Sequence, residues 1–119
     1  MSRINFLFII FVLFLFTSCA KEEKEISYIK ESEQKLEMIS AYREAYEALN
    51  KNDTFFAAKK FLEAELLFPQ SEWAPRSALM ASYSYYLQDF YAEALSNLQR
   101  YLKTYPNDNN LSYAHYLIA

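Results

Sequence analysis

Glycine is absent from all 119 residues of this chain, and cysteine occurs once, at Cys19. Loops that cradle phosphate groups need glycine to bring the backbone close to a nucleotide, so the usual nucleotide-binding loops are excluded. A single cysteine also excludes an intrachain disulfide and any metal site built from several cysteines. We therefore expect a protein that works without a nucleotide, a metal or another cofactor.

Clustered basic residues are also lacking. Twelve Lys and Arg stand against fifteen Asp and Glu, which gives a formal net charge of -3 and a sequence pI near 5.2. Because nucleic-acid binding depends on clustered cations that neutralise phosphates, we expect no nucleic-acid partner.

Residues that could form a catalytic relay are few. His115 is the single histidine, and no Ser, Cys or paired carboxylate lies at a spacing that suits a relay with it. Glu63 and Glu65 are separated by Ala64, so they point about 160° apart on a helix, which is wrong for a shared acid/base site. We expect both carboxylates on the solvated surface, and the sequence predicts no enzyme.

The chain begins with a pattern typical of a signal peptide. Arg3 precedes an apolar run from Phe6 to Phe16, and small residues follow directly before Cys19. The run is shorter than the roughly 20 residues that a membrane-spanning helix needs. We predict a signal peptide over residues 1–18, with a retained transmembrane anchor as the alternative.

Cys19 closes the sequence Phe16-Thr17-Ser18-Cys19, which is similar to a bacterial lipobox. The similarity implies cleavage before Cys19, a diacylglyceryl thioether on its sulfur and an acyl chain on its new amine. Since one acyl chain is marginal for membrane residence and two suffice, three would fix the protein to a bilayer. Ala20, in place of Asp, favours the outer membrane, and we predict a lipid anchor on its periplasmic side. The alternative is an ordinary signal peptide with a chance cysteine.

Lys and Glu dominate the segment after the cysteine. We predict that residues 19–35 form a lipidated cysteine and a charged tether, a solvated spacer that can become helical towards its end. A segment that docks a partner is the alternative.

Two later segments repeat one helical pattern. Aligning Pro106 with Pro69 places Ala94 on Ala57, Leu98 on Phe61 and Tyr101 on Ala64. This pattern is the second-helix signature of the tetratricopeptide repeat (TPR). It consists of a small residue, a large apolar residue four positions later, a further packing residue and a closing proline. The small residue lets the two helices of a hairpin approach closely, and proline ends the second helix. The pattern predicts an all-α, TPR-like solenoid of helical hairpins with roughly two and a half repeats.

We place these repeats within residues 36–119. The first repeat covers residues 36–69, the second covers 70–106, and a third begins over 107–119. Expected helix caps are Asp53, Ser71 and Asp89. Apolar residues at spacings of three and four predict the packed stripes. They are Leu36, Ile39, Tyr42, Tyr46 and Leu49 in the first helix and Tyr91, Ala94, Leu98 and either Tyr101 or Leu102 in the last complete one.

Several stretches together resemble the amino-terminal half of the BamD family, the outer-membrane lipoproteins of the β-barrel assembly machinery. They are Ala81-Ser82-Tyr83-Ser84-Tyr85-Tyr86, then Ala94 and Leu98, then Tyr105-Pro106 with Tyr113 and Tyr116. The resemblance implies a non-catalytic scaffold that helps fold and insert outer-membrane proteins, with a BamA-like barrel assembly protein and companion lipoproteins as partners.

Family members carry more repeats than this chain, so we expect a truncated or shortened relative. The family's carboxy-terminal repeats supply much of the docking surface for those partners, and the contacts are not assigned to residues here. Because the repeat alone does not specify its client, an adaptor for other cell-envelope or peptidoglycan factors is the alternative function.

Tyrosines fall at the positions of the first helices that line a groove in TPR proteins. The candidate groove residues are Tyr42, Tyr46, Arg76, Tyr83, Tyr86, Tyr113 and Tyr116. Tyrosine offers a broad apolar area and a hydroxyl at low rotamer cost, which suits an extended peptide. Unfolded outer-membrane proteins typically end in an aromatic residue and a free carboxylate, which Arg76 could pair. The alternative is that these rings are packed core.

Overall fold

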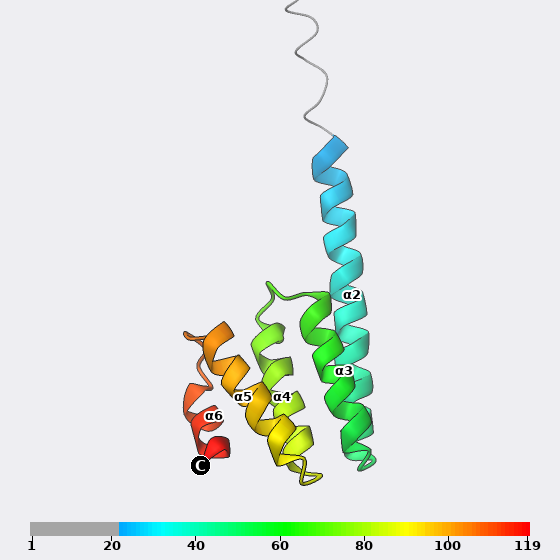
Figure 1. The fold of residues 1–119 in the computed structure, drawn as a ribbon. Coiled ribbons are helices and arrows are strands. Elements are labelled where there is room, and N and C mark those ends of the chain that lie inside the picture. Colours follow the sequence, from blue (N-terminus) through cyan, green and yellow to red (C-terminus); the bar gives the residue numbers. More distant parts are fainter. Residues whose placement is uncertain (1–21) are drawn as a thin grey trace, which may run out of the picture. The chain divides into compact units, whose positions relative to one another are not determined.

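The computed structural model describes residues 22–119, and all regular structure in this range is α-helical (Figure 1). The helices are α2 (Glu22–Asn50), α3 (Thr54–Leu67), α4 (Trp73–Tyr86), α5 (Tyr91–Thr104) and α6 (Leu111–Ile118). The predicted all-α fold of TPR-like hairpins is confirmed. The predicted signal peptide and the lipidation of Cys19 lie outside the described residues.

Helix α2 begins at Glu22, well before the helix start expected at Leu36. The segment predicted as a tether over residues 19–35 is therefore helical from Glu22 onward and not only towards its end, while its role as a tether stays a prediction. Lys, Glu and Gln are strong helix formers, and no Gly or Pro interrupts them. Side chains of residues 30–33 are exposed to solvent, as a polar segment of this kind requires. The chain divides into a unit of residues 1–32 and a unit of residues 33–119, and the hairpins lie in the second unit.

The predicted stripe of α2 is correct only in part: Tyr42 and Leu49 pack against the core, but the fully buried residues of the helix are others. Leu36 is 65% exposed and Ile39 is 45% exposed, whereas the residues that α2 buries are Met38, Ala41, Ala45 and Ala48. Ala45 and Ala48 cluster with Ala57 and Phe61 of α3, and Met38 and Ala41 cluster with Ala64. Small side chains allow the two helices to approach closely, so the alanines occupy the seam and the bulky residues flank it.

The tight turns form without glycine. Asn52 and Asp89 take left-handed backbone conformations, with φ of 64° and 62°. Asn and Asp tolerate this region better than other residues that carry a Cβ. Asp53 caps α3 as predicted, because its carboxylate accepts a hydrogen bond from the backbone N–H of Phe56 at 3.3 Å.

The other two predicted caps are wrong. Asp89 occupies the turn itself, and its carboxylate accepts a hydrogen bond from the Tyr91 hydroxyl at 2.6 Å. The N-cap of α5 is Phe90, which makes no side-chain cap. Ser71 donates its hydroxyl to the carbonyl of Phe68 at 2.8 Å and so closes the preceding turn.

The second helices of the two hairpins bury the residues that the repeat signature marks. Ala57, Phe61 and Ala64 are fully buried on α3, and Ala94, Leu98 and Tyr101 are buried on α5. Tyr91, predicted as part of the same stripe, is 57% exposed at the first position of α5. Helix α4 packs against α3 on one side and α5 on the other, and α5 packs against α6 (Figure 1).

Glu65 is buried, which contradicts its predicted place on the solvated surface. Only 4% of the residue is exposed. The Arg100 guanidinium donates from Nη1 to Oε1 and from Nη2 to Oε2 of Glu65, both at 2.7 Å, and the Tyr105 hydroxyl donates to Oε1 at 2.6 Å. These three donors compensate the carboxylate for its lost water.

Candidate functional site

A hollow of about 340 Å³ lies among the first helices of the hairpins. Its lining residues are Tyr42 from α2, Arg76, Leu79, Met80 and Tyr83 from α4, and Asn110 and Tyr113 at the start of α6. We call this hollow the tyrosine groove. The structure thus brings Tyr42, Arg76, Tyr83 and Tyr113, all predicted groove residues, to one place.

Tyr42 lines the tyrosine groove and is half-buried. Its ring meets Phe61 edge-on at a centroid distance of 5.1 Å and meets Trp73 edge-on at 5.2 Å. Edge-to-face pairs at this spacing are favourable beyond their area burial. Tyr42 therefore belongs both to the core, through Phe61, and to the groove, through its lining position.

Arg76 is held at the edge of the groove by an aromatic surface. Its guanidinium carbon lies 4.8 Å from the centroid of the Trp73 ring, which is a cation–π distance. The Arg76 side chain is exposed, and the ion pairs within residues 30–119 do not include it. A permanent, planar cation in this position is suited to pairing with a carboxylate of a ligand.

The hydroxyls of Tyr42 and Tyr113 in the groove are protonated at neutral pH. Burial raises the pKa of Tyr42 above its ordinary value, although the Arg76 charge opposes the shift. Burial also raises the pKa of Tyr113, and the neighbouring hydroxyls of Tyr83, Tyr116 and Tyr86 add to it. The rings of Tyr42 and Tyr113 therefore offer O–H groups that can donate to a peptide carbonyl.

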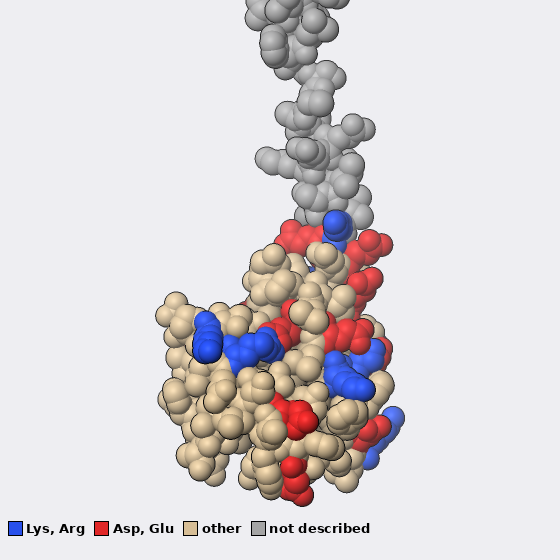
Figure 2. Space-filling model, in the orientation of Figure 1, with Lys and Arg blue, Asp and Glu red and all other residues tan. Residues whose placement is uncertain are grey.

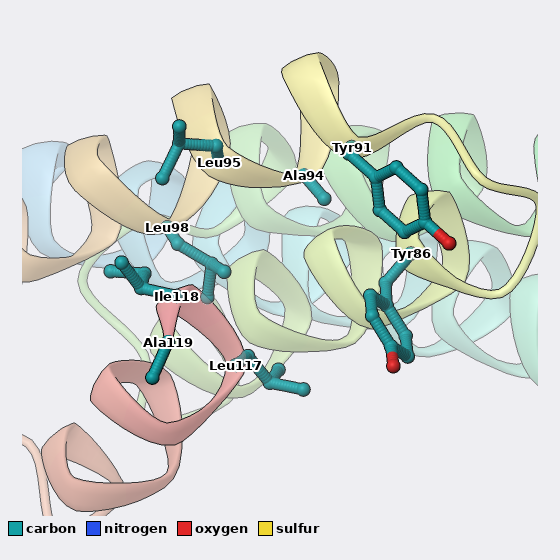
Figure 3. A pocket seen from close by; sticks show the side chains of 8 residues that line it. All are labelled: Tyr86, Tyr91, Ala94, Leu95, Leu98, Leu117, Ile118 and Ala119. Carbon is teal, nitrogen blue, oxygen red and sulfur yellow. The ribbon is translucent and has the colours of Figure 1, made fainter.

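Tyr86 lies in a second hollow, of about 280 Å³, between α4, α5 and α6 (Figure 3). Its lining residues are Tyr86, Tyr91, Ala94, Leu95, Leu98, Leu117, Ile118 and Ala119. The rings of Tyr86 and Tyr91 lie 5.8 Å apart at one side, and aliphatic side chains form the rest (Figure 3). Aliphatic and tyrosine side chains line this hollow, whereas the tyrosine groove also carries a cation.

Two of the predicted groove residues line neither hollow. Tyr46 is 52% exposed, and Tyr116 is 75% exposed and stacks on Tyr113 at a centroid distance of 6.3 Å. Sequence reasoning also missed Met80 and Asn110, which the groove includes. Asn110 precedes α6 as its N-cap residue, and the search for aromatic residues at helical spacing could not find it.

The side chains of the tyrosine groove supply apolar area, hydroxyl donors and one cation. Among residues 30–119, whose side chains the structure describes, no group of acidic, histidine or cysteine side chains is placed to hold a metal ion. No helix in the described part of the chain is long and apolar enough to cross a membrane. Acidic and basic side chains are interspersed on the face of the described residues that Figure 2 shows.

The comparisons with known proteins agree with this architecture. The family model YfiO, described as outer membrane lipoprotein, matches residues 34–119. The outer membrane protein assembly factor BamD of Caulobacter vibrioides is 34% identical over 101 residues, which cover 85% of this chain and 32% of the relative. The BamD of Neisseria gonorrhoeae is 36% identical over 76 residues, which cover 64% of this chain and 28% of the relative.

A third relative, the BamD of Xylella fastidiosa strain Temecula1, is 24% identical over 117 residues, 98% of this chain and 38% of the relative. The chain thus spans about a third of the length of the curated relatives that it matches. The family match covers the hairpins that carry the tyrosine groove. The chain belongs to the YfiO/BamD family of outer membrane lipoproteins.

Proposed function

We propose that this protein is a non-catalytic scaffold in outer-membrane protein assembly and that its tyrosine groove binds carboxy-terminal segments of unfolded outer-membrane proteins. Family membership and the role of the BamD relatives as outer membrane protein assembly factors support the first part. The observation that carries the second part is Arg76, an exposed cation at the edge of an aromatic hollow.

The size of the groove suits a side chain better than a folded domain. Its volume of about 340 Å³ is near the lower end of the roughly 300–1,000 Å³ range of small-ligand pockets. An aromatic ring of the client would enter between Tyr42 and Tyr83, and the terminal carboxylate would pair with Arg76 through charge-assisted hydrogen bonds. The protonated hydroxyls of Tyr42 and Tyr113 would then donate to the client backbone.

The proposal includes a place in the cell envelope. A lipid on Cys19 would hold the hairpins at the periplasmic side of the outer membrane, where unfolded barrel proteins pass. A BamA-like barrel assembly protein and companion lipoproteins are the proposed partners, and the described hairpins do not identify the surface that they use.

Calorimetric titration of a barrel-derived peptide tests the groove. The peptide ends in an aromatic residue with a free carboxylate, and a second peptide is identical except for a carboxy-terminal amide. Arg76→Gln should weaken binding of the acid peptide roughly fivefold, which is about 1 kcal/mol for one solvent-exposed charged pair. The same substitution should leave binding of the amide peptide unchanged, because that peptide has no carboxylate to pair.

Tyr83→Ala should weaken both peptides, since it removes a wall of the hollow. Tyr46→Ala is the matched control, because Tyr46 is an exposed tyrosine outside the hollow. Helicity is measured for each variant. If Arg76→Gln and Tyr83→Ala bind both peptides as wild type does, clients dock elsewhere, and capture of a peptidoglycan factor by the full chain would then favour the adaptor function.

A further inference from the structure

A hydrogen-bonded cluster of Glu65, Arg100 and Tyr105 connects the two complete repeats, and the Glu65 carboxylate at its centre is buried. Glu65 lies on α3, the second helix of the first hairpin, and Arg100 lies 35 residues later on α5, the second helix of the next hairpin. Tyr105 is the C-cap residue of α5. Since α3 packs on α4 and α4 packs on α5, these hydrogen bonds reach past α4 and join alternate helices of the stack.

The packing that separates these repeats consists largely of small side chains. Fully buried residues of α3 and α4 include Ala57, Ala58, Ala64, Ala74, Ala78, Ala81 and Ser82. Small residues let helices approach closely, but they form shallow ridges that interlock little with the grooves of a neighbouring helix. Such a seam leaves the crossing angle between the hairpins weakly defined. Directional polar contacts can define it, as buried polar groups do when they fix a register.

We propose that Glu65, Arg100 and Tyr105 form a latch that sets the angle between the first and second repeats and thereby the width of the tyrosine groove. The bidentate Glu65–Arg100 pair has two parallel hydrogen bonds of 2.7 Å, a geometry that allows little rotation. The Tyr105 hydroxyl adds a third bond from another direction. Consistently, the hydrogen bonds that Arg100 donates to Glu65 hold the pKa of Arg100 above its ordinary value, although burial opposes this.

The groove depends on this angle because its walls come from different repeats. Tyr42 lies on α2 of the first hairpin, whereas Arg76 and Tyr83 lie on α4 of the second. A rotation between the hairpins would change the separation of these walls. The consequence for a bound peptide rests on the proposed function, but the angle itself does not.

Lys60 forms ion pairs that do not connect the two repeats, so it provides a matched control. Its Nζ lies 3.1 Å from Glu44 and 2.8 Å from Glu63, and all three residues belong to the first hairpin. Its carboxylate partners are about half exposed, at 48% and 49%, whereas the Glu65 side chain is 6% exposed. Breaking the Lys60 pairs should therefore leave the angle between repeats unchanged.

The test measures the angle directly by double electron–electron resonance. Spin labels at Lys59→Cys on α3 and Ser96→Cys on α5 are introduced into the full chain with Cys19→Ser. Both labelled positions are exposed. The otherwise unmodified protein should give one narrow distance distribution. Glu65→Gln should give a broader or shifted distribution, and Lys60→Gln should not.

A double variant, Glu65→Leu with Arg100→Leu, keeps the test decisive where the single change unfolds the chain. It leaves no unpaired buried charge, and such replacements are often tolerated. We expect it to retain helicity by circular dichroism and to show a broad or shifted distribution. An unchanged distribution in a helical double variant would overturn the latch. Loss of helicity in the double variant would also overturn it, because the three residues would then be needed for folding itself.

Discussion

Enlarging Ala57 should destabilise the seam between the first and second helices. Ala57 is fully buried and clusters with Ala45 and Ala48 of α2, with Phe61 on its own helix and with Ala81 of α4. Three helices thus meet at one methyl group. Ala57→Leu adds three carbon atoms where no described hollow borders the site, so the helices must move apart.

The magnitude follows from that crowding. Overpacking a well-packed core costs typically about 1 to 3 kcal/mol. With three helices in contact we expect about 2 kcal/mol, which lowers the melting temperature by roughly 8 to 16 °C in a domain of this size. Ala94→Leu should cost less, near 1 kcal/mol, because Ala94 lines the apolar hollow beside Leu98 and a larger side chain can enter it.

Thermal unfolding followed by circular dichroism measures the effect, with Ala92→Leu as the control. Ala92 is exposed on α5, and Leu is nearly as good a helix former as Ala. The control should therefore change stability by less than about 0.5 kcal/mol. If the melting temperature of Ala57→Leu equals that of the control and of the wild type, the assigned inner face of α3 is wrong.

The remaining predictions concern the anchor and alkaline pH. Cys19→Ala should abolish incorporation of labelled palmitate and release the protein from membranes; label and membrane association that persist in this variant would contradict the lipoprotein assignment. Burial and the hydrogen bond to Asp108 raise the pKa of Tyr101, and burial and the hydrogen bond to Glu65 raise that of Tyr105. Folding therefore favours their neutral forms, so this stability is fully present below the ordinary tyrosine pKa of about 10 and is lost as pH rises above it. Melting temperatures should fall in that range and fall less steeply in Tyr105→Phe, and parallel profiles would contradict the assignment.

The repeat could be found from the sequence because its signature depends on residue size. Ala57 and Ala94 mark the close crossings, and Phe61 and Leu98 fill the seams, as the structure shows. The inner face of α2 could not be found in the same way. Two sets of residues on α2 share a spacing of three and four, one that starts at Leu36 and one that starts at Met38. Hydrophobic periodicity favours the first set as the buried one, because its residues are larger. Close packing of α2 against α3 instead selected the alanines, which left Leu36 exposed.

The burial of Glu65 depends on a contact that periodicity cannot reveal. A glutamate on a helix is usually solvated, and its compensation by Arg100 exists only once α3, α4 and α5 have packed. The groove was partly predictable, since Tyr42 and Tyr83 fall on matching faces of successive first helices. Tyr46 and Tyr116 follow the same spacing, but a modest rotation of a helix about its axis decides whether such a ring faces the hollow or the solvent.

Trp73 has a consequence for how the groove can be observed. It is the single tryptophan of the chain, and its ring lies 5.2 Å from the Tyr42 ring and 4.8 Å from the guanidinium carbon of Arg76. Indole emission is sensitive to a nearby charge, and excitation absorbed by an adjacent tyrosine transfers to it. A ligand that draws Arg76 away from the indole would therefore alter the fluorescence of the native protein. Ligand binding in the groove can therefore be followed by the intrinsic fluorescence of Trp73, without a label or an added chromophore.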